Sequence, residues 1–269
     1  WDSMYDPNQI TVPSLVPSEH VKNPPHFQMT QEVKPDFSAY RESGQGIHGC
    51  HSHLHNRDEL AKDIAIYYGM VSMMDHYIGQ IVNHLDALGL AENTLVVFTS
   101  DHGHFYGHHG LTAKGPFHYE DLIRVPMIVR QPGKVPAGEI STALQTLVDY
   151  APTFLSAADI KIPHSMTGKD QTGVWYNYDN TLKRDHVMVE NRHEPTTIHL
   201  KTYIEDRYKI TVYYNQSYGE LFDLETDPEE LHNLWDDPNS IELKSDLIAR
   251  FLSAQLGAEP LPMPRISGA

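Results

Sequence analysis

The chain has 269 residues, enough for one substantial hydrophobic core with a smaller unit attached to it. Its formal net charge of −16 argues against a nucleic-acid-binding protein, because such proteins need a basic surface. A hydrophobic content of 40% is ordinary for a globular protein, and no run approaches the roughly 18 apolar residues of a membrane-spanning helix. One cysteine excludes an intrachain disulfide and leaves open whether the compartment is cytoplasmic, periplasmic or secreted.

The first 47 residues are rich in proline and polar residues. We expect them to form a long extended connection along the rim of a site, because long loops in compact domains are usually functional. From Arg57 to Leu88, apolar residues recur at steps of three and four, which predicts an amphipathic helix ended by Gly89. The apolar stripe consists of Leu60, Ile64, Tyr67, Val71, Met74, Ile78, Ile81, Leu85 and Leu88.

Two short apolar runs follow the helix, at residues 95–98 and 125–129. Runs of this length and composition are typical of buried strands in a parallel sheet. Another helix is expected over residues 144–158, with an interruption near Pro152. These elements predict an α/β layer in which a mostly parallel sheet is flanked by helices.

Beyond a polar stretch at residues 159–184, the pattern changes from the period of helices to that of strands. We expect a small antiparallel sheet covered by a terminal helix over residues 241–256. Its strands are expected at residues 186–190, 199–205 and 208–214. The predicted parts of this α/β chain are a connecting rim segment (1–47), the carboxyl-terminal part of an α/β domain (48–165), and a linker with a small antiparallel α+β subdomain (166–269).

The most informative motif is Asp101-His102-Gly103, which follows the apolar run 95–98 after Thr99 and Ser100. An acid and an imidazole at the carboxyl end of a strand suit a metal site, because α/β proteins place their ligands there. Lys114 comes twelve residues after His102, and a cation beside a metal would hold the negative charge of an anionic ester. The simpler alternative makes Asp101 a turn cap, His102 a hydrogen-bonded edge residue and Lys114 a solvated cation.

This motif with its lysine resembles the sulfatase family, within the alkaline-phosphatase-like superfamily of sulfate and phosphate ester hydrolases. Three further segments resemble parts of that family in the same order along the chain. They are the helix 57–89 with its Tyr67-Tyr68-Gly69 and Met74-Asp75-His76 runs, the segment from Asp121 to Arg130, and the segment from Glu220 to Leu234. The resemblance implies an alkaline-phosphatase-like α/β fold and a sulfuric ester hydrolase that acts on a sulfated small molecule or carbohydrate.

The resemblance also implies the roles of the site residues. Asp101 and His102 would complete a divalent metal site, and Lys114 would act in catalysis by binding the sulfate group. Ca²⁺ is the first expectation, with Mg²⁺ or Mn²⁺ as alternatives because an imidazole is an unusual calcium ligand. His102 could instead contact the nucleophile or the sulfate, which would also be a catalytic role. His109 and His118, on either side of the lysine, are the candidates for substrate binding, although a structural hydrogen bond explains His118 equally well.

The chain departs from the family at the nucleophile. Sulfatases carry a Cys (or Ser)-x-Pro-x-Arg motif whose first residue is oxidised to formylglycine, and Cys50 lacks the Pro and Arg at that spacing. The family's amino-terminal pair of metal-binding acids is missing too. We therefore expect a carboxyl-terminal portion of a longer sulfatase, with formylglycine in a missing amino-terminal portion of the same enzyme. The isolated chain is expected to be inactive.

Two alternatives for function stay open: a phosphonate or phosphodiester hydrolase of the same superfamily, and a non-catalytic metal-binding fragment. A cluster of imidazoles around Cys50 also suggests zinc, although its spacing matches no common zinc pattern and a substrate-facing or ordinary surface loop explains it as well. This cluster consists of His48, Cys50, His51, His53 and His55.

Overall fold

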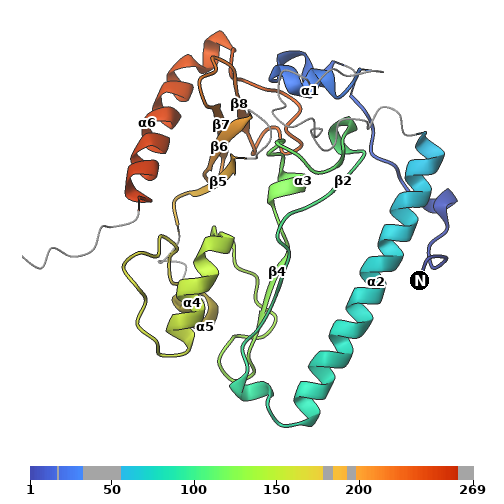
Figure 1. Cartoon of the computed structure of the whole chain (residues 1–269), viewed down its shortest axis with the longest axis vertical. Helices are drawn as coiled ribbons and strands as arrows, with labels where there is room; N and C mark the ends of the chain where they lie inside the picture. The colour runs from blue at the N-terminus through green and yellow to red at the C-terminus, as the bar shows by residue number, and fades with distance from the viewer. Residues whose placement is uncertain (17, 33–55, 178–183, 193–197, 260–269) are drawn as a thin grey trace, which may run out of the picture.

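The long helix α2 (Arg57–Ala87) runs along one side of the molecule, and the carboxyl-terminal sheet lies with helix α6 (Ile241–Gly257) at the other side (Figure 1). Strand β4 (Met127–Arg130) runs between these two parts. This arrangement comes from a computed structural model, which describes residues 1–16, 18–32, 56–177, 184–192 and 198–259.

The amino-terminal segment forms helical turns where its composition predicts an extended connection. Two of the turns begin with proline, whose missing N–H costs no hydrogen bond in a first helical turn. His26 and Phe27 are fully buried, and their rings lie 5.4 and 4.9 Å from the ring of Phe117. The segment is therefore anchored in the core by these two rings. Its helical turns are η1 (Pro7–Gln9), η2 (Glu19–Lys22) and α1 (Pro25–Met29).

Helix α2 confirms the predicted amphipathic helix. The Asn56 side chain caps it by accepting a hydrogen bond from the N–H of Asp58 at 2.8 Å. Among the described residues, only the first part of the helix is buried, and Met74 and Ile81 of the apolar stripe are 48% and 69% exposed. A short turn, η5 (Ala91–Asn93), leads from the helix towards the next strand.

Strands β1 (Val96–Thr99) and β4 pair antiparallel, so the expectation of parallel, buried strands is wrong for this pair. The chain between them folds back through residues 100–126, which contain only short elements and do not make the long helical crossover that joins most parallel neighbours. Phe98 lies opposite Ile128, and these side chains are 36% and 62% exposed. The described residues thus leave one face of this pair uncovered.

The connection between β1 and β4 is a compact loop region that contributes several residues to the shared core. Phe105, Leu111 and Phe117 are fully buried there and pack with Tyr119 and with residues of the carboxyl-terminal sheet. The short elements of this region are β2 (Phe105–Tyr106), η6 (His108–Gly110), β3 (Thr112–Ala113) and α3 (Glu120–Ile123).

The helix predicted over residues 144–158 is shorter than expected. Its first turn is η7 (Leu147–Asp149), and α4 (Tyr150–Ala157) continues it. Pro152 lies in the first turn of α4, where it interrupts nothing, so the expected break is not observed. The buried Asp149 accepts hydrogen bonds from Arg184 and from the N–H of Lys169, which ties α4 to the segment that contains α5 (Thr172–Asn177).

The carboxyl-terminal sheet confirms the predicted antiparallel unit with its helix, and it adds a fourth strand that the sequence did not predict. The strands follow one another in the order β5-β6-β7-β8. Helix α6 packs on the sheet through Leu247 and Phe251, and a turn, η9 (Pro238–Ser240), precedes it. The strands are β5 (Val187–Arg192), β6 (His199–Ile204), β7 (Tyr208–Tyr213) and β8 (Gly219–Asp223).

The α/β class with a small antiparallel sheet and a helix is thereby confirmed. One core joins the amino-terminal Phe27, the loop region around Phe117 and the sheet residues Leu200 and Phe222. The loop that follows Asp101 and His102 therefore packs directly on the carboxyl-terminal sheet. Among the described helices, none is long and apolar enough to cross a membrane.

Candidate active site

Gly103 fixes the point at which the chain turns after strand β1. Its N–H donates to the carbonyl oxygen of Leu122 at 2.7 Å. The two segments lie so close that a Cβ atom at position 103 would be 1.9 Å from the carbonyl oxygen of Asp121. A larger residue would push the segments apart, so this glycine holds Asp101 and His102 at the end of the strand.

His102 and Lys114 are in direct contact. The ammonium nitrogen of Lys114 lies 3.0 Å from Nε2 of His102, and Nδ1 of the same ring lies 2.8 Å from the carbonyl oxygen of Gly103. A carbonyl can only accept, so Nδ1 carries the proton and Nε2 offers a lone pair to the ammonium. The backbone thus selects the tautomer that points a lone pair at Lys114.

The carboxylate of Asp101 lies beside this pair and is largely exposed, with a side-chain exposure of 82%. One of its oxygens accepts the N–H of His102 at 3.0 Å, and the other lies 3.5 Å from Nε2 of His102. The hydrogen bond that the Asp101 carboxylate accepts from the His102 backbone is the main cause that lowers the pKa of Asp101. The group is therefore an ionised carboxylate that is open to a cation.

The side chains of Asp101 and His102 could supply part of a shared metal site. A carboxylate oxygen and a neutral imidazole nitrogen are both ligands for divalent ions, and the bond from Nδ1 to Gly103 is the type of support that orients a metal-binding histidine. Among the described residues, no group of three or more His, Cys, Asp or Glu side chains could hold an ion. These two residues can therefore supply only part of a coordination shell.

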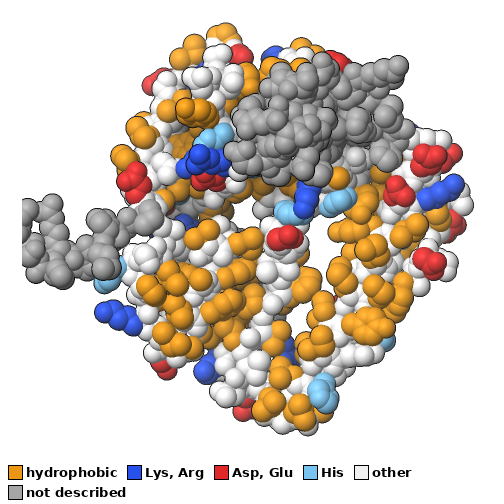
Figure 2. Space-filling view, in the orientation of Figure 1, with side chains coloured by type: hydrophobic (Ala, Val, Ile, Leu, Met, Phe, Trp, Pro, Cys, Tyr) orange, Lys and Arg blue, Asp and Glu red, His pale blue; other side chains and the backbone are white. Residues whose placement is uncertain are grey.

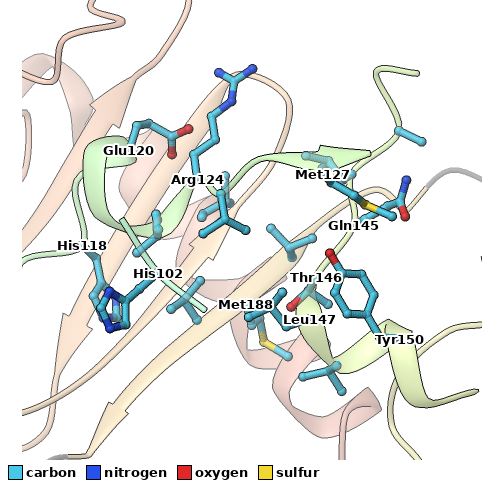
Figure 3. Close-up of a pocket in the computed structure, with 18 of the residues that line it drawn as sticks. His102, His118, Glu120, Arg124, Met127, Gln145, Thr146, Leu147, Tyr150 and Met188 are labelled. Carbon is cyan, nitrogen blue, oxygen red and sulfur yellow. The ribbon is translucent and has the colours of Figure 1, made fainter. Parts of the chain in front are cut away.

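A large open pocket of about 1900 Å³ contains this cluster. Figure 3 shows His102 and His118 at one end and Thr146, Leu147 and Tyr150 at the other. Apolar side chains of β4, η7 and β5 line other parts of the pocket, and Glu120 and Arg124 add further charged groups to its wall. An anionic group would be held at the histidine end by Lys114, the lysine that lines that end of the pocket.

His118 lines the same pocket and is almost fully buried. Its Nδ1 atom lies 2.7 Å from the hydroxyl oxygen of Thr202 in strand β6. Burial, with a smaller effect from the charge of Lys209, lowers the pKa of His118 to about 3. The ring is therefore neutral at ordinary pH, with one nitrogen anchored in the sheet.

His109 does not join the other predicted site residues. Its ring is buried and lies between two carboxylates, with Nδ1 2.5 Å from Glu19 and Nε2 3.3 Å from Asp121. The ring also stacks on Tyr119 at 3.6 Å. Because both nitrogens face carboxylates and the residue does not line the pocket, His109 anchors the loop in this structure where the sequence suggested a substrate contact.

The neighbouring histidines of the loop differ in their positions. The ring of His104 lies 4.6 Å from that of Tyr106, and burial, together with the charge of Lys114, lowers the pKa of His104. His108 lies 3.6 Å from Asp121. The cluster around Cys50 lies outside the described residues.

Sequence reasoning missed a group of buried charges behind His118. Lys209 of strand β7 is 1% exposed and pairs with Glu230, while Glu120 lies 3.4 Å from the same ammonium. Glu230 also accepts the N–H of Glu120 at 2.7 Å. No local pattern signals this network, because strand alternation would place a lysine between Tyr208 and Ile210 on the face opposite to them, which is normally exposed.

An ammonium, an imidazole and an exposed carboxylate at the end of a strand, in one open pocket, are the groups that a hydrolase of anionic esters uses. Family models agree with this class. The sulfatase model matches residues 15–160, and the model described as N-sulphoglucosamine sulphohydrolase, C-terminal, matches residues 107–256. Each covers more than half of the chain, and the chain belongs to the sulfatase family.

Curated relatives are similar over most of this chain. An N-acetylglucosamine-6-O-sulfatase of Bacteroides thetaiotaomicron is 33% identical over 63% of the chain and 31% of its own length. An arylsulfatase of Clostridium perfringens is 32% identical over 77% of the chain and 43% of its own length. The chain thus spans between about a third and a half of these relatives.

Solved structures share the fold. One, in complex with its substrate D-glucosamine-2-N,6-O-disulfate, matches with a TM-score of 0.64 and 29% identity over 75% of this chain and 40% of its own. A phosphonate monoester hydrolase from Silicibacter pomeroyi matches with a TM-score of 0.79 and 19% identity over 96% of this chain and 52% of its own. At that identity the second match shows the fold alone.

Proposed function

We propose that the enzyme built from this chain hydrolyses sulfate esters of a carbohydrate. The observation that carries the proposal is the contact of Lys114 with His102 next to the exposed Asp101, in the chain of a sulfatase. A sulfated carbohydrate is supported by two relatives, one named an N-acetylglucosamine-6-O-sulfatase and one solved with a disulfated glucosamine as its substrate.

In this proposal, each residue acts on the sulfate group or on the metal beside it. The ammonium of Lys114 neutralises the charge that grows on the sulfuryl and leaving oxygens as the S–O bond breaks. Asp101 and Nε2 of His102 hold a divalent ion, for which Ca²⁺ is the first candidate. When bound, such an ion polarises the sulfate and favours ionisation of the nucleophile. The nucleophile itself, a formylglycine, belongs to a further portion of the enzyme.

We further propose that this amino-terminal portion covers the apolar surface that the described residues leave exposed. Hydrophobic side chains lie exposed along α2 (Figure 2), among them Met74, Tyr77 and Ile81. Phe98 and Ile128 are exposed on the β1–β4 pair. Such a face is expected for an α/β layer whose remaining strands and helices lie elsewhere, because its sheets are normally covered on both faces.

A labelling experiment tests this covering. In a Cys50→Ser background, Ile81→Cys should react with a maleimide in this chain alone and be protected in the longer enzyme. Val21→Cys, which is 66% exposed on η2, is the matched control and should react in both. Equal labelling of Ile81→Cys in the two proteins would show that another partner, or none, occupies this face.

The activity is tested on the longer enzyme with glucosamine 6-sulfate and with an aryl phosphonate of matched size. Release of sulfate, at a rate far above that of phosphonate hydrolysis, is the expected result. A preference for the phosphonate would instead select the alternative hydrolase of the same superfamily. If the longer protein binds the sulfated sugar but catalyses neither reaction, it is a binding protein and the proposed hydrolase activity is wrong.

A further inference from the structure

A chain of hydrogen bonds connects the pocket histidine His118 to the buried interior of the carboxyl-terminal sheet. Nδ1 of His118 lies 2.7 Å from the hydroxyl oxygen of Thr202, which lies 2.8 Å from the hydroxyl oxygen of Thr211. The side chain of Thr211 is hydrogen-bonded in turn to the carboxyl group of Glu220. Four side chains from the loop and from β6, β7 and β8 therefore form one continuous series.

The register of the sheet holds this series in place. Thr202 is directly opposite Thr211 on β6 and β7, and Thr211 is directly opposite Glu220 on β7 and β8. Directly opposed side chains on one face of an antiparallel sheet lie close enough to bond. Thr202, Thr211 and Glu220 are all at most 3% exposed, so water does not replace any bond in the series. Apart from Lys209, the other buried residues of these strands are mostly apolar, and this alignment explains the burial of two threonines and a glutamate among them.

The series constrains the proton on His118, because each hydroxyl has one hydrogen to donate. An ionised Glu220 can only accept, so Thr211 donates to it, Thr202 donates to Thr211, and Nδ1–H of His118 donates to Thr202. Nε2 is then a bare lone pair. A protonated Glu220 permits the reverse order, in which Thr202 donates to Nδ1 and the proton of His118 is on Nε2.

Nε2 is the nitrogen that remains for a ligand. His118 lines the pocket together with His102 and Lys114, and Figure 3 labels the two histidines. Nε2 of His118 makes no hydrogen bond to another residue in the part of the chain that the structure describes. The ring stays neutral well below neutral pH, since burial lowers its pKa to about 3. Its bonding character thus depends on the position of its one proton.

We propose that Thr202, Thr211 and Glu220 are positioning residues that set whether Nε2 of His118 donates to, or accepts from, a group of the substrate. The proposal rests on the proposed function for the identity of that substrate, a sulfated sugar whose sulfate oxygens accept hydrogen bonds. The donor form of Nε2 is the one that binds a sulfate oxygen. Ionisation of Glu220 therefore weakens substrate binding through three intervening side chains.

The surroundings of Glu220 place this change in an accessible pH range. Burial raises the pKa of Glu220 to about 8, with Lys209 and the hydrogen bond from Thr211 acting in the opposite direction. The other groups that face it are Glu230, whose charge raises the pKa further, and the hydroxyls of Tyr213 and Tyr119. Tyr213 lies 3.4 Å from the Glu220 carboxyl group.

The direct test reads the tautomer of His118 and needs no catalysis. In the ¹⁵N-labelled chain, the ring nitrogens of His118 should shift towards the Nδ1–H form as pH rises, with a midpoint near 8. In Glu220→Gln the ring-nitrogen shifts of His118 should no longer change near this pH. In Thr202→Val they should also stop following the ionisation of Glu220, because the connecting hydroxyl is gone. Thr202→Ser, which keeps the hydroxyl, should restore the wild-type titration. A tautomer that is unchanged by pH and by these substitutions would overturn the proposal.

Kinetics of the longer enzyme supply the second measurement. KM for the sulfated sugar should rise roughly tenfold above pH 8 in the wild type, the loss of about one good hydrogen bond to an anion, and should stay flat in Glu220→Gln. If KM depends on pH in Glu220→Gln as it does in the wild type, Glu220 does not influence substrate binding and the proposal is wrong. If the tautomer titrates as expected but no sulfate ester is hydrolysed, the proposed function fails while the series from Glu220 to His118 stands.

Discussion

The ammonium nitrogen of Lys114 lies 3.0 Å from Nε2 of His102, and this contact uses the one lone pair of that ring. The other ring nitrogen, Nδ1, carries the proton and donates a hydrogen bond to the carbonyl oxygen of Gly103. A metal ion and Lys114 therefore cannot both bind Nε2 at the same time. An ion on Asp101 and His102 would free the ammonium for the sulfate group, so the two proposed roles fit one another.

Loss of Lys114 should reduce turnover more than substrate binding, because the charge that it neutralises grows mainly in the transition state. We expect Lys114→Ala in the longer enzyme to lower kcat by roughly 10²–10³. Its melting temperature should be unchanged, since the side chain is exposed. Lys134→Ala, at an exposed turn outside the pocket, is the control and should keep both values. A near-normal kcat in Lys114→Ala would show that this lysine has no role in catalysis.

Metal binding is measured on the chain itself, with Mn²⁺ as a paramagnetic probe. Asp101→Asn should weaken binding by at least roughly tenfold, because it removes an anionic ligand. Lys114→Met should strengthen it, because the competitor for Nε2 of His102 and a nearby positive charge are both removed. Asp2→Asn, at a side chain that is 90% exposed, should change nothing. Equal Mn²⁺ affinities in all four proteins would place the ion elsewhere.

Asn233 should be a strong determinant of stability. Its buried amide accepts the N–H groups of Leu221 and Trp235 and donates to the carbonyls of Lys22 and Gly219.

Asn233→Ala leaves these four backbone groups without that partner, and each such buried loss costs about 1–3 kcal/mol. We therefore expect the free energy of unfolding to fall by at least about 3 kcal/mol, measured with urea. Asn239→Ala, at an exposed turn residue, is the control. A loss below about 1 kcal/mol would mean that water replaces the amide in the variant.

Stability should decrease as pH rises above neutral. Burial lowers the pKa of His109, but hydrogen bonds to Asp121 and Glu19 outweigh it and raise the pKa to about 9. Because the folded state binds this proton more tightly than the unfolded state does, protonated His109 stabilises the fold. This contribution to the free energy of unfolding is fully present below the unfolded pKa near 6.5 and is lost as pH rises through about 9. Glu220, with a pKa raised to about 8 by burial, acts in the same direction between about 4.5 and 8.

Urea unfolding between pH 6 and 9.5 measures this decrease. His109→Gln should show a shallower dependence on pH than the wild type, whatever its stability at pH 6. His232→Gln, at an exposed position, should keep the wild-type slope. If His109→Gln keeps the full slope, the ring is not charged between its two carboxylates.

The elements whose patterns are local were predictable from the sequence. Helix α2 and helix α6 follow from apolar residues at steps of three and four, and three strands of the carboxyl-terminal sheet follow from alternation. Strand β8 was missed because four of its five residues are buried on both faces of the sheet, so the alternation that marks a half-exposed strand is absent.

The sequence by itself determined the family, the Asp101-His102-Gly103 motif at a strand end and the lysine twelve residues later, because each is a run of neighbouring residues. Only the tertiary structure decided the antiparallel pairing of β1 with β4, the burial of His109 between Glu19 and Asp121, and the series from His118 to Glu220. These features join residues far apart in the chain. Their geometry depends on strand register and on which side chains the core excludes from water, and neither is encoded in a local pattern.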